Sequence, residues 1–113
     1  MQDGLVSVIM PSYNTGKYIA ASIHSVIAQT YDLWELIIVD DASTDDTDSV
    51  VAPFLTDERI RYIKNPVNMG AALSRNTALR AATGKWIAFL DSDDIWAPEK
   101  LSRQTAFMLE NDY

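Results

Sequence analysis

Residues 86–94 read WIAFLDSDD, an apolar run that ends abruptly in a cluster of carboxylates. Its apolar half, Trp86–Leu90, is continuous rather than alternating, which is typical of a strand buried on both faces of a parallel sheet. Three other β-branched-rich runs have the same character, and they lie at Leu5–Met10, Leu36–Val39 and Ile60–Ile63. The sequence therefore predicts four short buried strands.

Helical patterns separate these runs. The first, Tyr18–Gln29, places its apolar residues on one face at helical spacing. The second follows Ser43 and Thr44, which are favoured N-cap residues, and it has acidic residues in its first turn. We expect Pro53 to shorten or bend this second helix, because proline cannot donate a backbone hydrogen bond.

Two further helices complete the alternation. The third is expected from about Met69 to Ala82, ending near Gly84 as a C′ glycine, and the fourth opens with Pro98 at its first position. Alternating strands and helices indicate βαβ units with right-handed crossovers. The expected fold is α/β, with a mainly parallel four-stranded sheet flanked by helices, in one domain spanning residues 1–113.

Composition excludes several classes of protein. The formal net charge of −7 disfavours nucleic-acid binding through a basic face. The absence of cysteine excludes disulfides, thiolate catalysis and Cys-zinc sites. No apolar run approaches the roughly 20 residues that cross a bilayer, and no signal peptide is visible at the N-terminus. We expect a cytoplasmic protein, or one that is peripheral to the inner face of the membrane in a longer form.

Polar residues follow each predicted strand. The clusters are Pro11-Ser12-Tyr13-Asn14, Asp40-Asp41, Asn65 to Gly70, and Asp91-Ser92-Asp93-Asp94. In open parallel sheets, ligands bind beyond the carboxyl ends of the strands, at the point where the strand order reverses. The four clusters are therefore expected to line one acid-rich cleft.

The last cluster has the spacing of a metal site. In an extended segment, Asp91 and Asp93 point the same way, because residues i and i+2 share a face. Converging carboxylates suit a hard cation such as Mg²⁺ or Mn²⁺, which can hold a diphosphate. The alternative is a turn in which an aspartate caps the following backbone N–H groups.

The other clusters offer binding groups with ordinary alternatives. Of Asp40 and Asp41, one carboxylate is expected to serve the following helix start while the other faces the cleft; the alternative is a double N-cap. Tyr13 could stack on a base, or it could belong to an ordinary turn. Gly70 could bring backbone amides to a phosphate, or it could be a turn glycine.

Arg75 is a cation within the third predicted helix. On a helical wheel it falls among alanines and Leu79, on what looks like an apolar face. A buried arginine needs a partner, and we expect either Asp91 or a ligand phosphate. The alternative is an arginine whose head reaches solvent.

Taken together, four segments resemble glycosyltransferase family 2. They are VSVIMPSYN (residues 6–14), ELIIVDDASTDDT (35–47), NPVNMGAALSRNTAL (65–79) and GKWIAFLDSDDIWAPEKL (84–101). The resemblance covers the chain from Leu5 to about Leu109. It implies a Rossmann-like GT-A half-domain and the transfer, usually with inversion, of a sugar from a nucleotide-diphosphate donor to a saccharide or lipid acceptor.

The resemblance also implies residue roles. The loop Pro11–Tyr13 and Asp41 would hold the base, commonly uracil, and Asp40 would support its strand end. Arg75 would lie near the diphosphate. Asp91-Ser92-Asp93 would be the DxD motif, with Asp93 the direct ligand of Mn²⁺ or Mg²⁺. Ala42 stands where the family more usually has glycine, and little effect is expected from one added methyl group.

Complete catalytic domains of this family are about twice as long, and their catalytic base lies after the DxD motif. No residue in this chain is assigned as base, so the acceptor half is expected to be absent and isolated activity weak. Two rivals remain. One is a phospho-receiver domain, although its acidic pair after the first strand is missing. The other is a non-catalytic nucleotide-binding module whose exposed apolar surface would promote self-association.

Overall fold

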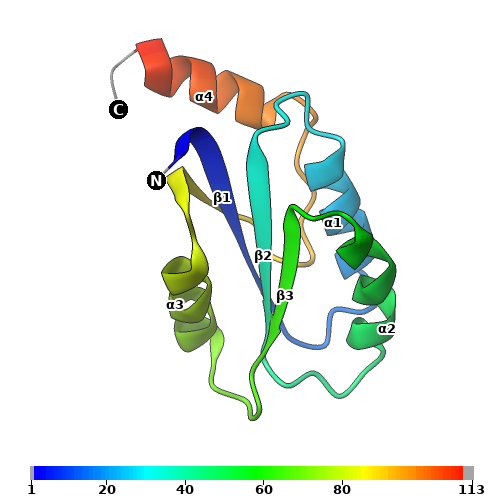
Figure 1. Cartoon of the computed structure of the whole chain (residues 1–113). Helices are drawn as coiled ribbons and strands as arrows, with labels where there is room; N and C mark the ends of the chain where they lie inside the picture. The colour runs from blue at the N-terminus through cyan, green and yellow to red at the C-terminus, as the bar shows by residue number, and fades with distance from the viewer. Residues whose placement is uncertain (1, 111–113) are drawn as a thin grey trace.

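The computed structural model describes residues 2–110 as a parallel sheet with helices on both faces (Figure 1). The strands are β1 (Gln2–Ser12), β2 (Trp34–Asp40), β3 (Ile60–Lys64) and β4 (Gly84–Phe89). The helices are α1 (Ile19–Ile27), α2 (Thr47–Val51), the 3₁₀ helix η1 (Ala52–Thr56), α3 (Ala71–Ala81) and α4 (Lys100–Glu110). The predicted α/β alternation is confirmed.

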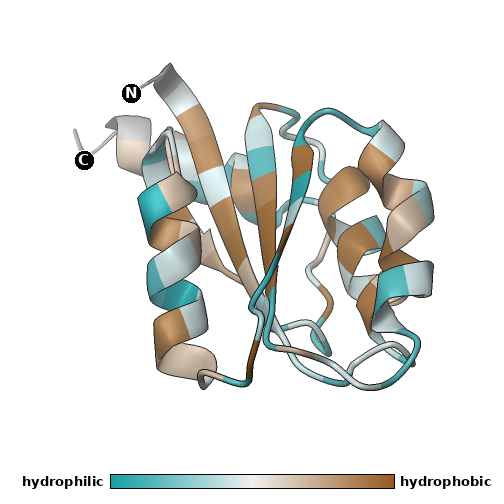
Figure 2. Ribbon diagram, turned by 60° about the horizontal axis from the view of Figure 1, so that its bottom comes forward, coloured by the Kyte–Doolittle hydropathy of each residue, from teal (hydrophilic) through white to brown (hydrophobic). Residues whose placement is uncertain are grey.

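The sheet has the order β3-β2-β1-β4, and its pairings are all parallel. The first two crossovers step in one direction across the sheet, and the crossover through α3 steps back past β1. Crossovers of one hand that step in opposite directions put their helices on opposite faces. Accordingly, α1 and α2 cover one face and α3 covers the other (Figure 2). The order reverses beside β1, which marks the expected ligand crevice.

The core has two parts, one on each face of β1 and β2. The larger part packs strand residues such as Val8 and Leu36 against Ile23 of α1, and it also contains Leu101 of α4. The smaller part consists of Ile9, Ile37, Val39 and Ala78, the last from α3. β1 and β2 are thus buried on both faces, as their continuous apolar runs predict.

The two edge strands depart from that prediction, since β3 is only partly buried and β4 is open on one face. Ile87 and Phe89 are 42% and 54% exposed. They pair with Ser7 and Ile9 of β1, so they point to the face that carries α3. On that face α3 packs over β1 and β2 and leaves β4 uncovered. The expectation that β4 is buried on both faces is therefore wrong, because a run of apolar residues does not reveal which strand lies at an edge.

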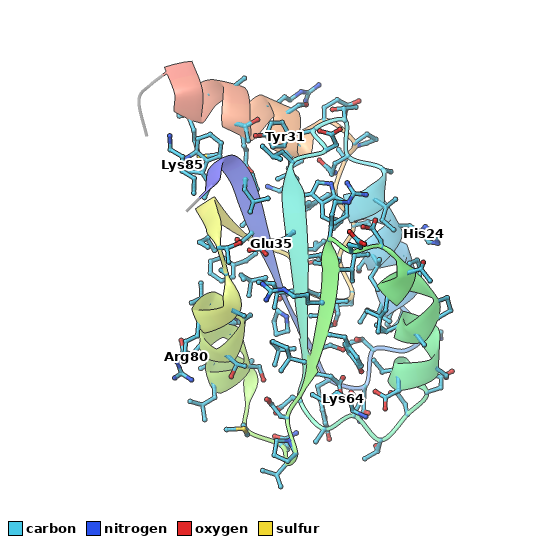
Figure 3. All side chains as sticks on the ribbon, in the orientation of Figure 1. His24, Tyr31, Glu35, Lys64, Arg80 and Lys85 are labelled. Carbon is cyan, nitrogen blue, oxygen red and sulfur yellow. The ribbon has the colours of Figure 1, made fainter. Side chains whose placement is uncertain are left out.

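A polar cluster around Glu35 of β2 links all four strands on the α3 side (Figure 3). Its carboxylate accepts hydrogen bonds from Ser7 Oγ of β1 (2.5 Å) and from the Thr83 backbone N–H just before β4 (2.7 Å). It also pairs with Arg61 of β3 at 3.1 Å. Burial alone would raise the pKa of Glu35, but these hydrogen bonds and Arg61 outweigh it and lower the pKa below its usual range.

The second helix begins later than expected. Ser43 and Thr44 do not cap it: α2 starts at Thr47 after Asp46, and Ser43 instead bonds Asp40. Pro53 falls in η1 immediately after α2, so the prediction that it shortens the helix is confirmed.

Two other residues predicted to mark helix boundaries, Gly84 and Pro98, lie outside the helices. α3 ends at Ala81 through an extended Ala82, and Gly84 is the first residue of β4 rather than a C′ glycine. A Cβ on Gly84 would lie 2.6 Å from Ser7 Oγ, so close packing against β1 accounts for this glycine. Pro98 precedes α4, which starts at Lys100, by two residues.

Candidate functional site

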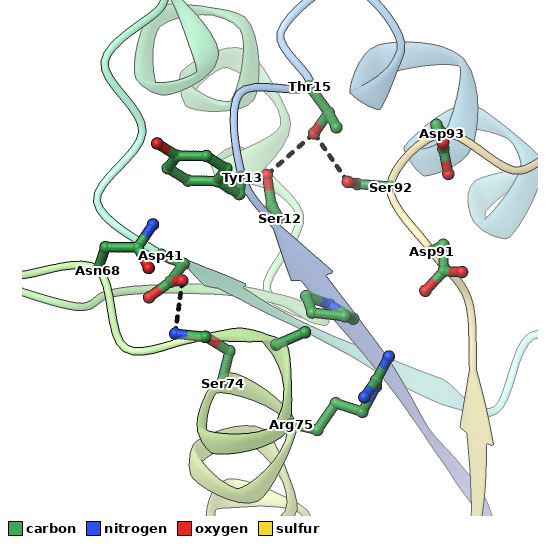
Figure 4. Close-up of a pocket in the computed structure, with 13 residues that line it drawn as sticks. Ser12, Tyr13, Thr15, Asp41, Asn68, Ser74, Arg75, Asp91, Ser92 and Asp93 are labelled. Atoms are coloured by element: carbon green, nitrogen blue, oxygen red, sulfur yellow. Dashed lines mark hydrogen bonds between the residues drawn. The ribbon is translucent and has the colours of Figure 1, made fainter.

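An open cavity of about 440 Å³ lies at the carboxyl ends of the strands (Figure 4). Residues that follow each strand contribute to it. The lining consists of Pro11, Ser12, Tyr13, Thr15, Asp41, Asn68, Gly70, Ala71, Ser74, Arg75, Asp91, Ser92 and Asp93. The structure therefore gathers most of the sequence-predicted site residues in one place, and Asn14 and Asp40 lie outside the lining.

The acidic cluster after β4 forms a turn rather than an extended segment. The Asp94 backbone N–H donates to the Asp91 carbonyl at 3.0 Å. One carboxylate oxygen from each of Asp91, Asp93 and Asp94 lies within 4.8 Å of the others, and all three residues are exposed. The expected convergence occurs, but the turn produces it, and the turn adds Asp94, which an i, i+2 argument misses. Such a donor set fits a hard divalent cation.

The turn is held by hydroxyl groups from the first βα segment. Ser22 Oγ of α1 donates to the Asp94 carbonyl at 2.5 Å. Thr15 Oγ1 donates to Ser92 Oγ at 2.7 Å. Ser92 is only 4% exposed although its neighbours in the turn are open to solvent. The three carboxylates thus belong to a turn whose Ser92 side chain is held by a hydrogen bond from Thr15.

The paired aspartates after β2 point in different directions. Asp40 is fully buried and accepts hydrogen bonds from the backbone N–H and the hydroxyl of Ser43 (2.9 and 2.5 Å). Asp41 lines the cavity and accepts from the backbone N–H groups of Met69 (2.6 Å) and Gly70 (2.9 Å) and from Asn65 Nδ2 (3.0 Å). One carboxylate therefore supports the loop after its strand and the other reaches the cleft.

The surroundings of Asp41 keep it ionised. Burial alone would raise its pKa, but the hydrogen bonds from Met69, Asn65 and Gly70 outweigh burial and lower the pKa below the usual range. Gly70 has φ +92°, a conformation that favours glycine, and its backbone N–H donates a hydrogen bond to Asp41. The turn explanation of Gly70 is thus supported by its backbone.

At the end of β1, Pro11 and Ser12 line the cavity, and Tyr13, the first residue after the strand, lines it too and is half exposed. Asn14 does not line the cavity. It has φ +52°, and its Oδ1 accepts from the Thr44 N–H at 2.8 Å, while its own N–H donates to Ser43 Oγ. Asn14 therefore joins the loops after β1 and β2.

Arg75 lines the cavity but is exposed, so the expectation that it lies on a buried apolar face is wrong. The buried residues of α3 are Ser74 and Ala78, and small residues let the helix lie close to the sheet. In Figure 4 Arg75 extends toward the side of the cavity that carries Asp91. The ion pairs found within residues 2–110 do not include Arg75.

Sequence reasoning missed Thr15, Ala71 and Ser74, which line the cavity, whereas Asn68 belongs to the predicted cluster Asn65 to Gly70. The three missed residues carry no distinctive pattern. Ala71 and Ser74 reach the cavity because of how α3 approaches the end of β1, and Thr15 because of how the loop after β1 folds.

The glycosyl transferase family 2 model matches residues 7–113, so the chain belongs to this family. Among its relatives is the Escherichia coli UDP-Glc:alpha-D-GlcNAc-diphosphoundecaprenol beta-1,3-glucosyltransferase WfgD, 54% identical over 111 residues. The match covers 98% of this chain and 44% of WfgD. The chain thus spans less than half the length of this curated relative.

Solved structures agree on the fold. Staphylococcus aureus TarS in complex with UDP-GlcNAc superposes with a TM-score of 0.90 at 34% identity, over 95% of this chain and 32% of TarS. A mannosyltransferase from Pyrobaculum calidifontis in complex with GDP-Man and Mn²⁺ gives 0.84 at 33% identity, over 91% of this chain and 32% of that protein. The GT-A-like fold implied by the resemblance is confirmed.

Topology and family membership remove the phospho-receiver alternative. Receiver domains have the strand order 2-1-3-4-5, whereas in this chain β3 lies beyond β2. Within residues 2–110, no helix combines the length and apolar character required to span a bilayer.

Proposed function

We propose that this chain binds the donor of an inverting glycosyltransferase that transfers a sugar from a nucleotide-diphosphate sugar, UDP-linked, to a saccharide or lipid-linked acceptor. The observation that carries the proposal is the cavity at the strand ends, which combines an aromatic side chain, a cation and an acidic turn. These are the groups that a base, a diphosphate and a divalent metal require.

The arrangement suggests how the donor lies. Tyr13 offers a face for stacking at the end of the cavity near Asp41, and the loop Pro11–Ser12 borders the ribose. Arg75 and the acidic turn lie on the other side (Figure 4). We therefore place the base near Tyr13 and the diphosphate between Arg75 and Asp91. A relative solved with UDP-GlcNAc supports UDP as the nucleotide.

We assign Asp93 and Asp91 as ligands of Mn²⁺ or Mg²⁺. A divalent cation there would neutralise charge on the departing nucleoside diphosphate. Asp91 and Asp93 hold their oxygens close to one another despite their like charges, which fits a cation-binding role. Arg75 would supply a second positive charge beside the diphosphate, and it can do so because its side chain is exposed to the cavity.

We assign no catalytic base within this chain. The oxygens of Asp41 are engaged by Asn65, Met69 and Gly70, and the turn carboxylates are assigned to the metal. We propose that the base and the acceptor site belong to residues outside this 113-residue chain, since relatives such as WfgD are more than twice as long. The chain alone then binds donor with weak or no transfer.

The acceptor proposal rests on the relatives. WfgD is named for a diphosphoundecaprenol acceptor, which is a lipid. We propose a lipid-linked saccharide acceptor, polysaccharide synthesis as the setting, and a cytoplasmic location at the inner face of the membrane. A non-catalytic nucleotide-binding module remains the second candidate, favoured by the lack of an assignable base.

Titration calorimetry with UDP, GDP and their sugars, with and without Mn²⁺, tests the donor site. We expect UDP to bind more tightly with Mn²⁺, and Asp93→Ala to weaken Mn²⁺-dependent binding by about tenfold or more, since a lost charged contact is worth over 1.4 kcal/mol. Glu58→Ala is the matched control, because Glu58 is an exposed acid before β3, at the opposite end of the strands. Unchanged metal-dependent binding in Asp93→Ala would refute the metal assignment.

A further inference from the structure

A chain of three hydroxyl groups links the end of β1, through the loop after it, to the acidic turn after β4 (Figure 4). Ser12 Oγ and Thr15 Oγ1 are 3.1 Å apart, and Thr15 Oγ1 lies 2.7 Å from Ser92 Oγ. The middle member, Thr15, is half-buried and lines the cavity. Of the three hydroxyl groups, that of Thr15 is the one that contacts both Ser12 and Ser92.

The direction of the hydrogen bonds follows from counting protons. A threonine hydroxyl has one hydrogen, and Thr15 donates it to Ser92. Thr15 must then accept from Ser12, so the chain runs from Ser12 through Thr15 to Ser92. Ser92 lines the cavity between Asp91 and Asp93, so a bond that holds its side chain also holds the middle of the acidic turn.

The Asp91–Asp94 turn requires stabilising contacts such as the hydrogen bond from Thr15 to Ser92. Asp91, Asp93 and Asp94 bring like charges together on an exposed turn, and their repulsion favours opening it. The side-chain contacts that oppose this opening are the bond from Ser22 to the Asp94 carbonyl and the bond from Thr15 to Ser92. Only the second one also reaches the loop that carries Tyr13.

We infer that Thr15 is a positioning residue that holds the metal-binding turn in register with the nucleotide-binding loop, an inference that rests on the proposed donor site. Thr15 acts through Ser92: by holding the middle residue of the turn, it holds the carboxylates of Asp91 and Asp93 in the arrangement that a divalent cation needs. Thr15 therefore sets how strongly Mn²⁺ improves nucleotide binding, and has little influence on the nucleotide alone.

The test uses Thr15→Val, which keeps the shape and removes the hydroxyl, and measures UDP affinity with and without Mn²⁺ by calorimetry. The readout is the factor by which Mn²⁺ improves UDP binding. We expect this factor to fall by about tenfold, because loss of this hydrogen bond lets the metal-binding carboxylates of the turn move apart. UDP affinity without Mn²⁺ should change by less than about twofold. Thr15→Ser retains the hydroxyl, so this variant should keep most of the factor by which Mn²⁺ improves UDP binding.

Two controls separate positioning from general damage. Thr56→Val removes an exposed hydroxyl in η1, away from the cavity lining, and should leave both affinities unchanged. In a double-mutant cycle, Thr15→Val combined with Ser92→Ala should lower the factor by which Mn²⁺ improves UDP binding no further than Ser92→Ala alone. Both substitutions remove the same Thr15–Ser92 hydrogen bond. Additive effects of the two substitutions would overturn the inference.

The outcomes distinguish this inference from the proposed function. If the unsubstituted chain binds no UDP and shows no Mn²⁺ effect, the donor site itself is wrong. If the unsubstituted chain responds to Mn²⁺ and Thr15→Val keeps the same factor, the donor site stands and the role of Thr15 is refuted. An equal loss of affinity with and without Mn²⁺ also refutes it, because that is the signature of a merely structural residue.

Discussion

At the scale of single residues, backbone conformation carries information that the sequence pattern does not. Ala42 has φ +61°, in the left-handed region where a Cβ is unfavourable. The family resemblance marks this position as a more usual glycine and implies that one added methyl group has little effect. The positive φ predicts instead that this methyl group lowers the stability of the fold. The methyl group is small, but it stands on a backbone conformation that glycine adopts readily and alanine adopts only with strain.

Ala42→Gly should therefore stabilise the protein. We expect the free energy of unfolding to rise by about 1 kcal/mol, since relief of the left-handed strain exceeds the entropy that glycine gains in the unfolded chain. The same substitution at exposed Ala72, inside α3, is the matched control and should lower it by about 1 kcal/mol. Urea unfolding measures both, and a destabilised Ala42→Gly would contradict the strain argument.

At the scale of elements, the side chain of Glu35 connects neighbouring strands by hydrogen bonds. The Glu35 cluster connects β2 to β1 through Ser7, to β3 through Arg61 and to the start of β4 through Thr83. These bonds cross the sheet on the face where the apolar core is small. The cluster replaces apolar contacts there, and its strength depends on the ionised form of Glu35.

Glu35→Gln tests this dependence on charge. Because the pKa of Glu35 is lowered in the folded state, its contribution is full above the unfolded pKa of about 4.3 and is lost as pH falls through the lower folded value. At pH 7 the substitution should cost about 1–2 kcal/mol.

The stability difference between the parent chain and Glu35→Gln should shrink at about pH 3, which is below the unfolded pKa of about 4.3, because the unfolded chain then binds a proton that the folded chain resists. Glu58→Gln, an exposed acid, should show no comparable difference at either pH. Urea unfolding at the two pH values is the measurement, and a gap that widens in acid would contradict the assignment.

At the scale of the whole molecule, the exposed face of β4 is the unusual surface. Ile87 and Phe89 present large apolar side chains on an edge strand, next to the cavity but outside its lining. Exposed apolar surface of this kind promotes association. This is the surface that the sequence-based expectation of self-association requires.

We predict that the 113-residue chain associates with itself as its concentration rises, and that Ile87→Lys with Phe89→Lys keeps it monomeric. Leu55→Lys is the control, because Leu55 is exposed in η1 away from β4. Sedimentation velocity across a concentration series gives the result. A chain that remains monomeric without substitution would show that this face does not drive association.

The sequence by itself determined the elements and most of the cavity. Continuous apolar runs located four parallel strands, and the polar residues after them are the ones that gather at the carboxyl edge. This works because strand periodicity and strand ends are local properties. Helix starts at Thr47 and Lys100 were placed less well, because several residues near each boundary could have capped it.

Only the tertiary structure decided which side chains have partners. It showed that Asn14 and Asp40 support loops, that Arg75 is exposed, and that Thr15 connects two segments 77 residues apart. It also showed that β4 has an open face. The physical reason is the same throughout: residue type and spacing set local conformation, whereas exposure and hydrogen-bond partners depend on how helices and strands distant in the chain pack together.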